Sequence, residues 1–283
     1  MIVIESVAGM QAQSRNWQQS GESIALVATM GNLHQGHISL VDIAKNKADR
    51  VVVSIFVNPT QFAEGEDLDT YPKTWDADKT ACELAGVDCI FFPGESEMYY
   101  KNKSIGVSEE SLSQSLCGAS RPGHFSGVVT VVAKLFNICL PDYAVFGRKD
   151  FQQLSIIKRL VRDLNFPIEI LEGDIIREAD GLAMSSRNQY LSADERLAAL
   201  LINQSLHAAE LLYESGEKQC SALIRRFLET AEQVGLRIDY AEIRSVEHLE
   251  LLEMVFEQSV FAVAVYVGDT RLIDNVVLKS TEI

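Results

Sequence analysis

Short runs of apolar residues alternate with amphipathic stretches over the first 175 residues of the chain. The apolar runs predict five buried strands: IALVA (24 to 28), VVVSIFV (51 to 57), DCIFF (88 to 92), YAVFG (143 to 147) and IEIL (168 to 171). Between them lie stretches with helical periodicity, at about 37 to 48, 74 to 85, 124 to 140 and 151 to 163. Fully apolar strands separated by helices are typical of a parallel sheet covered on both faces. We therefore predict a doubly wound α/β domain whose first strand is IALVA.

The pattern changes after Glu172-Gly173-Asp174. Two helical stretches, at about 192 to 214 and 217 to 234, come before three strand-like segments, RIDYAEI, SVFAVAVYV and TRLIDNVVL. Helices followed by a run of strands predict a smaller α+β domain. We place the boundary near residue 175, which gives domains of residues 1–175 and 176–283.

With 283 residues, 47% of them hydrophobic, the chain can bury a large core. No stretch approaches the roughly 18 consecutive apolar residues that a membrane span needs, and the N-terminal residues lack the basic segment of a secretory signal. The five cysteines form no C-x-x-C pair, which favours reduced thiols in the core over disulfides or a zinc site. We expect a soluble, cytoplasmic protein with no membrane partner.

The formal net charge of −15 and the isoelectric point near 4.8 bear on the choice of partners. A strongly acidic surface works against a general affinity for nucleic acids or anionic membranes. We therefore expect no nucleic-acid partner, and any anionic ligand must meet a local positive site.

The stretch VATMGNLHQGHISL (27 to 40) carries two of the five histidines at a predicted junction of strand and helix. In open α/β folds, ligands bind at the carboxyl ends of the strands, and a helix N-terminus attracts phosphate. Gly31 and Gly36 allow backbone to approach such a ligand closely, and His34 and His37 can donate hydrogen bonds to phosphate oxygens. Two other interpretations remain: the histidines only cap a solvated helix, or they form a metal pair, although no third ligand stands nearby.

A second segment, SIFVNPTQF (54 to 62), carries a predicted strand into a long polar loop at 58 to 72. Loops of that length in compact domains are often functional. Asn58 and Gln61 are neutral amides suited to binding a small hydroxy acid. The alternative is that Asn-Pro simply begins a turn.

Two later segments carry cationic side chains. In FGRKDFQQL (146 to 154), Lys149 can neutralise phosphate at a helix start, or it is a surface charge beside an Asp150 helix cap. In READGLAMSSRNQYL (177 to 191), Arg187 and two serine hydroxyls can close over a triphosphate, or they belong to an ordinary polar turn.

The string A-T-M-G-N-L-H-Q-G-H resembles the H-x-G-H signature of class I aminoacyl-tRNA synthetases and nucleotidylyltransferases. Together with F-V-N-P-T-Q-F, R-P-G-H-F, F-G-R-K-D-F-Q-Q and M-S-S-R-N, it resembles the pantothenate synthetase (pantoate–β-alanine ligase) family over nearly the whole chain. The five strings occupy residues 28–37, 56–62, 121–125, 146–153 and 184–188. The chain departs from the usual strings at Ala28, Asn32, Arg148 and Cys117.

This resemblance implies a Rossmann-like first domain, and a second domain that contributes a lid over the active site. It also implies condensation of pantoate with β-alanine through a pantoyl adenylate, with ATP and Mg²⁺, and a homodimer. The implied catalytic residues are His34, His37, Lys149, Ser185, Ser186 and Arg187. The implied ATP-binding residues are Met30, His37, Gly147, Lys149, Asp150, Met184, Ser185, Ser186 and Arg187. The implied pantoate and β-alanine site comprises Met30, Asn58, Gln61 and Gln153. No protein ligand is assigned to the metal, and Asp78 is left out as a weak candidate.

Three other classes of protein share parts of this pattern. A nucleotidylyltransferase acting on a phosphorylated alcohol needs the histidines but not the amide-bearing strings. A nucleotide-binding protein without catalysis would bind ATP and release no pyrophosphate. A tRNA-charging enzyme fits poorly with the acidic balance and the lack of an appended RNA-binding domain.

Overall fold

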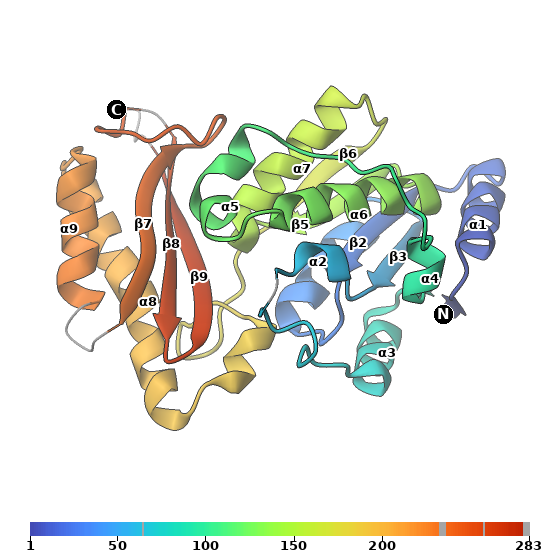
Figure 1. Cartoon of the computed structure of the whole chain (residues 1–283), viewed down its shortest axis with the longest axis horizontal. Helices are drawn as coiled ribbons and strands as arrows, with labels where there is room; N and C mark the ends of the chain where they lie inside the picture. The colour runs from blue at the N-terminus through green and yellow to red at the C-terminus, as the bar shows by residue number, and fades with distance from the viewer. Residues whose placement is uncertain (64, 232–235, 257, 280–283) are drawn as a thin grey trace. The chain divides into compact units, whose positions relative to one another are not determined.

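The computed structural model describes residues 1–63, 65–231, 236–256 and 258–279 (Figure 1). The chain forms two compact units. The first contains residues 1–111, 121–148 and 156–174, and the second contains residues 112–120, 149–155 and 175–283. Two short segments that come before residue 175 in the chain thus belong to the second unit, an arrangement that the local sequence pattern does not reveal.

The first unit contains a six-stranded sheet. Its strands are β1 (Ile2–Ile4), β2 (Ile24–Thr29), β3 (Arg50–Ile55), β4 (Cys89–Phe91), β5 (Tyr143–Gly147) and β6 (Glu169–Gly173). Their order is β1-β4-β3-β2-β5-β6, and all neighbours are parallel, which confirms the predicted parallel sheet. The prediction that IALVA is the first strand was wrong, because β1 precedes it. β1 has only three residues, two of them exposed, and so leaves no recognisable apolar run.

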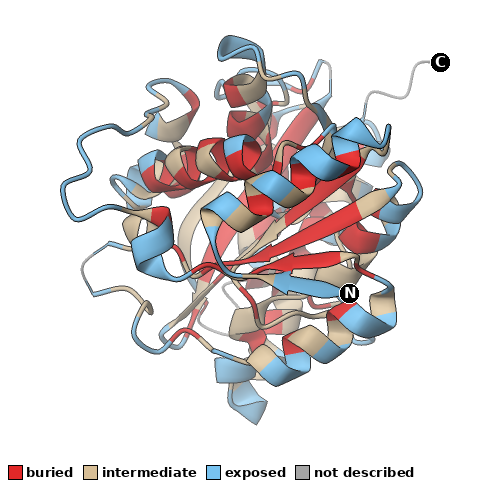
Figure 2. Ribbon diagram, turned by 90° about the vertical axis from the view of Figure 1, so that its right-hand side faces the viewer, coloured by how far each residue is buried: buried red, intermediate tan, exposed pale blue. Residues whose placement is uncertain are grey.

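Helices cover both faces of this sheet. The helices of the first unit are α1 (Val7–Gln19), α2 (Gln35–Lys45), α3 (Trp75–Ala85), α4 (Glu95–Met98) and α6 (His124–Cys139). Helices α2 and α3 contact each other, as do α1 and α6, and both α2 and α6 pack against β2. In Figure 2 the buried positions gather on the strands and on the helix surfaces that face them. The doubly wound prediction is therefore confirmed. Helix α7 (Phe151–Asp163) begins in the second unit and ends in the first.

The strand order reverses direction at β2. From β2 the chain proceeds to β3 on one side, and later enters β5 on the other side. The register pairs Ala25 with Tyr143 and Val27 with Val145, so the carboxyl ends of β2 and β5 meet at one edge of the sheet. In open α/β folds such a reversal creates the crevice in which ligands bind.

The second unit has a three-stranded antiparallel sheet and two long helices. Its strands are β7 (Arg237–Ser245), β8 (Ser259–Val267) and β9 (Thr270–Leu278), and its helices are α5 (Leu116–Ser120), α8 (Ala193–Glu214) and α9 (Cys220–Ala231). Helices α8 and α9 pack on each other and on the sheet, around a core that includes Leu206, Phe227 and Phe261. This arrangement confirms the α+β class. The final residues of the helix predicted at 217 to 234 lie outside the described residues.

All five cysteines are free and buried, which confirms their prediction as reduced core residues. Burial raises the pKa of the Cys82 and Cys89 thiols to about 12, so neither ionises at neutral pH. Among the residues that the structure describes, no helix combines the length and the apolar composition that crossing a membrane requires.

Candidate active site

The turn between β2 and α2 has an unusual backbone. Gly31 has a φ of +86° and Asn32 a φ of +50°, both in the left-handed region. A Cβ atom on Gly31 would lie 3.0 Å from Asp78 Oδ2 and 3.2 Å from Ile55 Cγ2, so glycine is required here for conformation and for space. Asparagine tolerates the left-handed region better than most residues, which accounts for Asn32 at this position.

A buried carboxylate holds this turn in place. Asp78, on the first turn of α3, is 3% exposed. Its Oδ2 accepts a hydrogen bond from the Asn32 N–H at 2.9 Å, and its Oδ1 accepts one from the Leu33 N–H at 2.7 Å. The Thr74 hydroxyl donates to Oδ2 at 3.1 Å. Both carboxylate oxygens are therefore engaged by protein donors, and Asp78 links α3 to the turn that precedes the histidines.

The two histidines cap the start of α2 with one nitrogen each. The His34 Nδ1 accepts from the Gly36 N–H at 3.1 Å, and the His37 Nδ1 accepts from the His34 N–H at 3.2 Å. Their rings lie 4.1 Å apart between centroids. Because both Nδ1 atoms accept, each neutral imidazole carries its proton on Nε2. Capping uses Nδ1, whereas a bond to phosphate would use the Nε2–H, so the capping interpretation does not exclude the phosphate interpretation.

The structure brings Met30, Asn58 and Gln61 together. Asn58 is 1% exposed and precedes the 3₁₀ turn η1 (Pro59–Gln61). Its Nδ2 donates to Gln61 Oε1 at 3.0 Å, and the Gln61 Nε2 contacts the Met30 sulfur at 3.2 Å. The Tyr99 hydroxyl donates to Asn58 Oδ1 at 2.8 Å. This chain of contacts fixes the amide orientation of Gln61, and Tyr99 is a contributor that the sequence did not reveal.

A cavity opens beside these residues in the first unit. Its volume is about 480 Å³, and its wall includes Met30, Gly31, Phe56, Pro59 and Asp78. Cavities of this size accommodate small organic molecules. Met30 therefore lies where a ligand can reach it.

The second unit contains Lys149, Asp150 and Gln153. Lys149 is half-buried and Asp150 exposed, in the 3₁₀ turn η3 (Arg148–Asp150) that follows β5. The Lys149 carbonyl accepts from the Nδ2 of Asn275, which is 4% exposed on β9, at 3.0 Å. Gln152, three residues further along the chain, has structural partners. Its Nε2 donates to two main-chain carbonyls of the 112–120 segment, at 2.8 and 2.7 Å. Gln153 is half-buried.

The residues 184–187 also belong to the second unit. Ser185 caps the 3₁₀ turn η4 (Ser186–Tyr190), and its hydroxyl accepts from the Arg187 N–H at 3.2 Å. Asn188 then anchors the turn, since its Nδ2 donates to Glu178 Oε1 at 2.6 Å and to the Ala183 carbonyl at 3.0 Å. The serine and arginine side chains are thus presented on a braced turn.

Glu178 connects this turn to α8, because its carboxylate also pairs with Arg196 at 2.6 Å. The Arg196 hydrogen bond lowers the pKa of the Glu178 carboxyl, burial opposes that shift, and Asn188 adds to the lowering. A carboxyl whose pKa falls on folding stabilises the protein above its unfolded pKa, and the stabilisation is lost as the pH falls through the folded pKa.

We expect Glu178→Gln to lower the urea midpoint at pH 7, with a difference from wild type that shrinks as the pH falls below the ordinary carboxyl pKa of 4.5. Urea unfolding between pH 3.5 and 7 measures this dependence. Glu169→Gln is the control, because Glu169 is exposed at the start of β6. A difference that stays constant over this pH range would contradict the ionic role of Glu178.

Two departures from the family strings have structural partners. Arg148 pairs with Glu172 at 2.7 Å and with Asp174 at 3.0 Å, within the first unit. Within the second unit, the Cys117 sulfur lies 3.2 Å from the Tyr240 hydroxyl, and Arg271 approaches it at 3.5 Å. Across the described parts of the chain, no three His, Cys, Asp or Glu side chains are grouped to hold a metal ion.

Comparison with known proteins gives one consistent result. The sequence profile of the pantoate-beta-alanine ligase family matches residues 2–277. The chain is 52% identical to the pantothenate synthetase of Geobacter sulfurreducens, over 98% of this chain and 99% of that protein. It is 48% identical to the pantothenate synthetase of Thermotoga petrophila, over 98% of this chain and all of that protein.

Solved structures agree with the sequence comparison. The crystal structure of pantothenate synthetase from Thermus thermophilus superposes with a TM-score of 0.94 at 40% identity, covering 99% of this chain and 100% of that chain. A pantoate-beta-alanine ligase from Francisella tularensis, complexed with beta-gamma ATP and beta-alanine, has a TM-score of 0.82 at 33% identity, covering 98% of each chain.

Proposed function

Because the chain belongs to the pantoate-beta-alanine ligase family, it is a ligase that condenses pantoate with β-alanine at the expense of ATP, and we propose how its residues carry the two steps. In the first step a pantoate carboxylate oxygen attacks the α-phosphorus of ATP, and pyrophosphate leaves. In the second step the β-alanine amine attacks the acyl carbon of pantoyl adenylate. An amide bond forms, the amine loses a proton, and AMP leaves.

The first step uses the substrate as its nucleophile, so the protein must align it and stabilise charge. One observation supports this role above the others: the two Nδ1 atoms of His34 and His37 accept from backbone N–H groups, which puts the proton of each neutral ring on Nε2, the nitrogen that would donate to a phosphate oxygen. They stand at the N-terminus of α2, where the helix dipole also favours negative charge. We assign both histidines to the phosphates of ATP.

For pantoate, the proposal rests on the contacts among Met30, Asn58 and Gln61. The Asn58 amide holds Gln61 Oε1, which leaves Nε2 as the side of the Gln61 amide that can donate to a substrate oxygen. Gln153 of the second unit is assigned to the same substrate by its place in the family string. The small hydroxy acid thereby meets neutral amides that match its hydroxyl and carboxylate groups.

The remaining ATP contacts are assigned by the family strings. Gly147 would let the nucleotide approach the sheet edge, Lys149 would steady the charge on the phosphates, and Asp150 would bind the ribose. Met184, Ser185, Ser186 and Arg187 would form a lid over the phosphates. When bound, Mg²⁺ would neutralise charge on the phosphates. No protein ligand is assigned to it, and both oxygens of Asp78 accept from protein donors. The family analogy also supports a cytoplasmic location and a homodimer, and light scattering can test the homodimer.

The test of this function is ATP–pyrophosphate exchange by purified protein, with and without pantoate, followed by AMP release on addition of β-alanine. We expect exchange only with pantoate, and AMP release only with β-alanine. Exchange that instead requires a phosphorylated alcohol would identify a nucleotidylyltransferase. ATP binding without exchange would contradict the ligase function.

The lid assignment gives its own prediction. Arg187→Ala is expected to release more pantoyl adenylate to water, because a closed lid excludes water from the intermediate. The ratio of AMP formed without β-alanine to AMP formed with it measures this leakage. Arg162→Ala, at an exposed ion pair near the end of α7, is the control. Equal leakage from the wild type and from a turning-over Arg187→Ala variant would refute the lid.

A further inference from the structure

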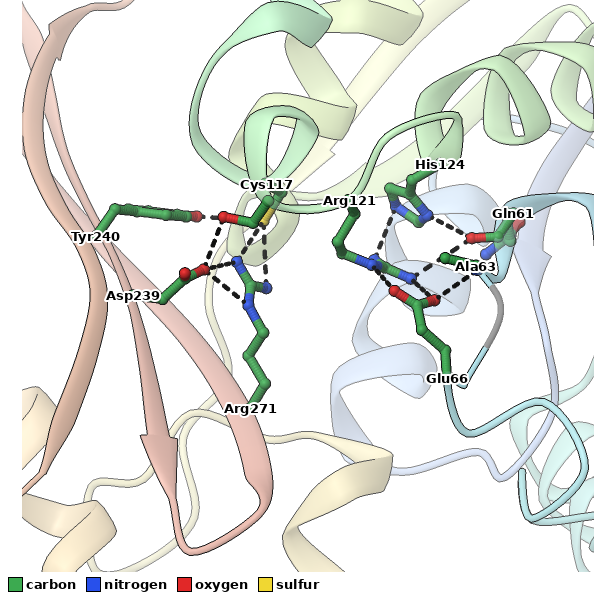
Figure 3. A network of polar contacts seen from close by, with 10 residues as sticks. Gln61, Ala63, Glu66, Cys117, Arg121, His124, Asp239, Tyr240 and Arg271 are labelled. Carbon is green, nitrogen blue, oxygen red and sulfur yellow. Dashed lines mark hydrogen bonds and ion pairs between the residues drawn. The ribbon is translucent and has the colours of Figure 1, made fainter.

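The R-P-G-H-F segment, residues 121–125, has no role in the proposed function. It belongs to the first unit and includes the start of α6. The loop that follows β3 in the same unit carries Gln61 and Glu66. Figure 3 shows polar contacts joining these two segments. We propose that Arg121, His124 and Glu66 are positioning residues that hold Gln61 for pantoate, an inference that rests on the proposed function.

Arg121 forms a two-pronged ion pair with Glu66. Its Nε lies 2.6 Å from Glu66 Oε1, and its Nη2 lies 2.7 Å from Oε2. The Ala63 N–H also donates to the Glu66 carboxylate, at 3.2 Å. The two side chains are only 17% and 23% exposed, so solvent screens this pair less than a typical surface pair. The ion pair therefore ties the loop just after Gln61 to the start of α6.

His124 contacts Gln61 directly. Its Nδ1 lies 2.7 Å from the Gln61 carbonyl oxygen, and its Nε2 lies 3.1 Å from the Arg121 Nη1. A carbonyl only accepts and a guanidinium only donates, so the contacts require a neutral imidazole with its proton on Nδ1. His124 thereby relays the position of Arg121 to the main chain of Gln61.

The first turn of α6 lies against the same peptide. A Cβ atom at Gly127 would lie 2.3 Å from the Thr60 carbonyl oxygen and 2.6 Å from the Gln61 nitrogen, so only glycine permits this approach. The Gly127 carbonyl also accepts from Asn58 Nδ2 at 3.2 Å. The segment from Arg121 to Gly127 thus fixes the main chain of Gln61, while Asn58 fixes its side chain.

Because these contacts hold Gln61 and not the histidines, changing them should affect the KM of one substrate and not of the other. Loosening the main chain at Gln61 moves an amide that binds pantoate, whereas the histidines that bind ATP lie on another turn. The effect should therefore fall on the pantoate KM and leave the ATP KM nearly unchanged. A role in general stability alone would change neither KM selectively.

The test uses Arg121→Ala and Glu66→Gln, with Arg50→Ala as the matched control. Like Arg121, Arg50 forms ion pairs within the first unit, with Glu22 at 2.6 Å and with Asp88 at 3.0 Å. Arg50, however, lies at the amino end of β3. We expect Arg121→Ala to raise the pantoate KM about tenfold, the loss expected for one or two hydrogen bonds. Glu66→Gln should raise it less, and Arg50→Ala should leave it unchanged.

A double variant separates positioning from stability. In a Gln61→Ala background, Arg121→Ala should raise the pantoate KM no further, because the residue that it positions is gone. Independent, multiplicative effects would overturn the proposal, as would an unchanged pantoate KM in Arg121→Ala. Should circular dichroism show Arg121→Ala to be unfolded, the nearly isosteric Glu66→Gln decides alone by the same criteria. If the wild-type protein itself showed no pantoate-dependent ATP–pyrophosphate exchange, that result would instead refute the proposed function.

Discussion

Replacing His37 by alanine is expected to reduce pantoate-dependent ATP–pyrophosphate exchange by roughly 10²- to 10³-fold, the loss typical of removing one preorganised donor to a developing charge. The proposed role requires the Nε2–H of His37, whereas its Nδ1 caps α2. Lys149→Ala should cause a loss of the same order, since it removes a positive charge proposed to contact the phosphates. Exchange measured at saturating pantoate and ATP checks both.

Two conservative variants separate the duties of His37. An asparagine side chain places its polar group near the Nδ1 position and can preserve the cap, but it does not reach the Nε2 position. A glutamine side chain reaches the Nε2 position and can still donate there. We therefore expect His37→Gln to retain more exchange activity than His37→Asn, although His37→Asn keeps the cap. The reverse order would assign His37 to capping alone, and near-native activity of either alanine variant would remove that residue from the mechanism.

The second large effect is expected at Asp78. In Asp78→Asn, one of the two oxygens that accept from the Asn32 and Leu33 N–H groups becomes an NH₂ donor, which faces an N–H and cannot bond to it. Leaving a buried donor unsatisfied costs about 1–3 kcal/mol, and more where a charged acceptor is lost. We therefore expect a lower melting temperature, and a fall in exchange of about tenfold or more because the turn before His34 shifts.

Asp76→Asn provides the matched control for Asp78→Asn. Asp76 also lies on the first turn of α3, but it is exposed. Thermal unfolding and exchange should both stay close to wild type in this variant. If Asp78→Asn lowered the melting temperature without lowering exchange in the protein that remains folded, the carboxylate would support the fold without orienting the turn.

Much of the fold can be predicted from the sequence because its central strands are completely apolar. The strands predicted at 24 to 28 and 143 to 147 correspond to β2 and β5 within one residue. Helix α1 was not predicted, because its buried positions are only Met10, Ser14 and Trp17. Three positions, one of them polar, do not produce an apolar stripe. The helix predicted to begin at residue 37 begins at Gln35, because His34 caps it.

The candidate site likewise contains residues that the sequence predicts and residues that only the fold reveals. The strand-to-helix junction locates His34 and His37, and local strings identify Asn58 and Gln61. Asp78, however, meets its turn across 46 residues of sequence, and Arg121 meets Glu66 across 55. No local periodicity records such contacts. The R-P-G-H-F string points to residues 121–125, but only the fold shows that Arg121 contacts Glu66 and that His124 contacts Gln61.

The buried thiols have a practical consequence for spectroscopy. All five native cysteines are buried, so maleimide dyes should leave the folded wild-type chain nearly unlabelled. An experimenter could therefore introduce one reactive cysteine at Leu84 in α3 and another at Leu197 in α8, both strongly exposed, without first removing the native cysteines. Energy transfer between the two dyes would then report any rearrangement of the two units during turnover.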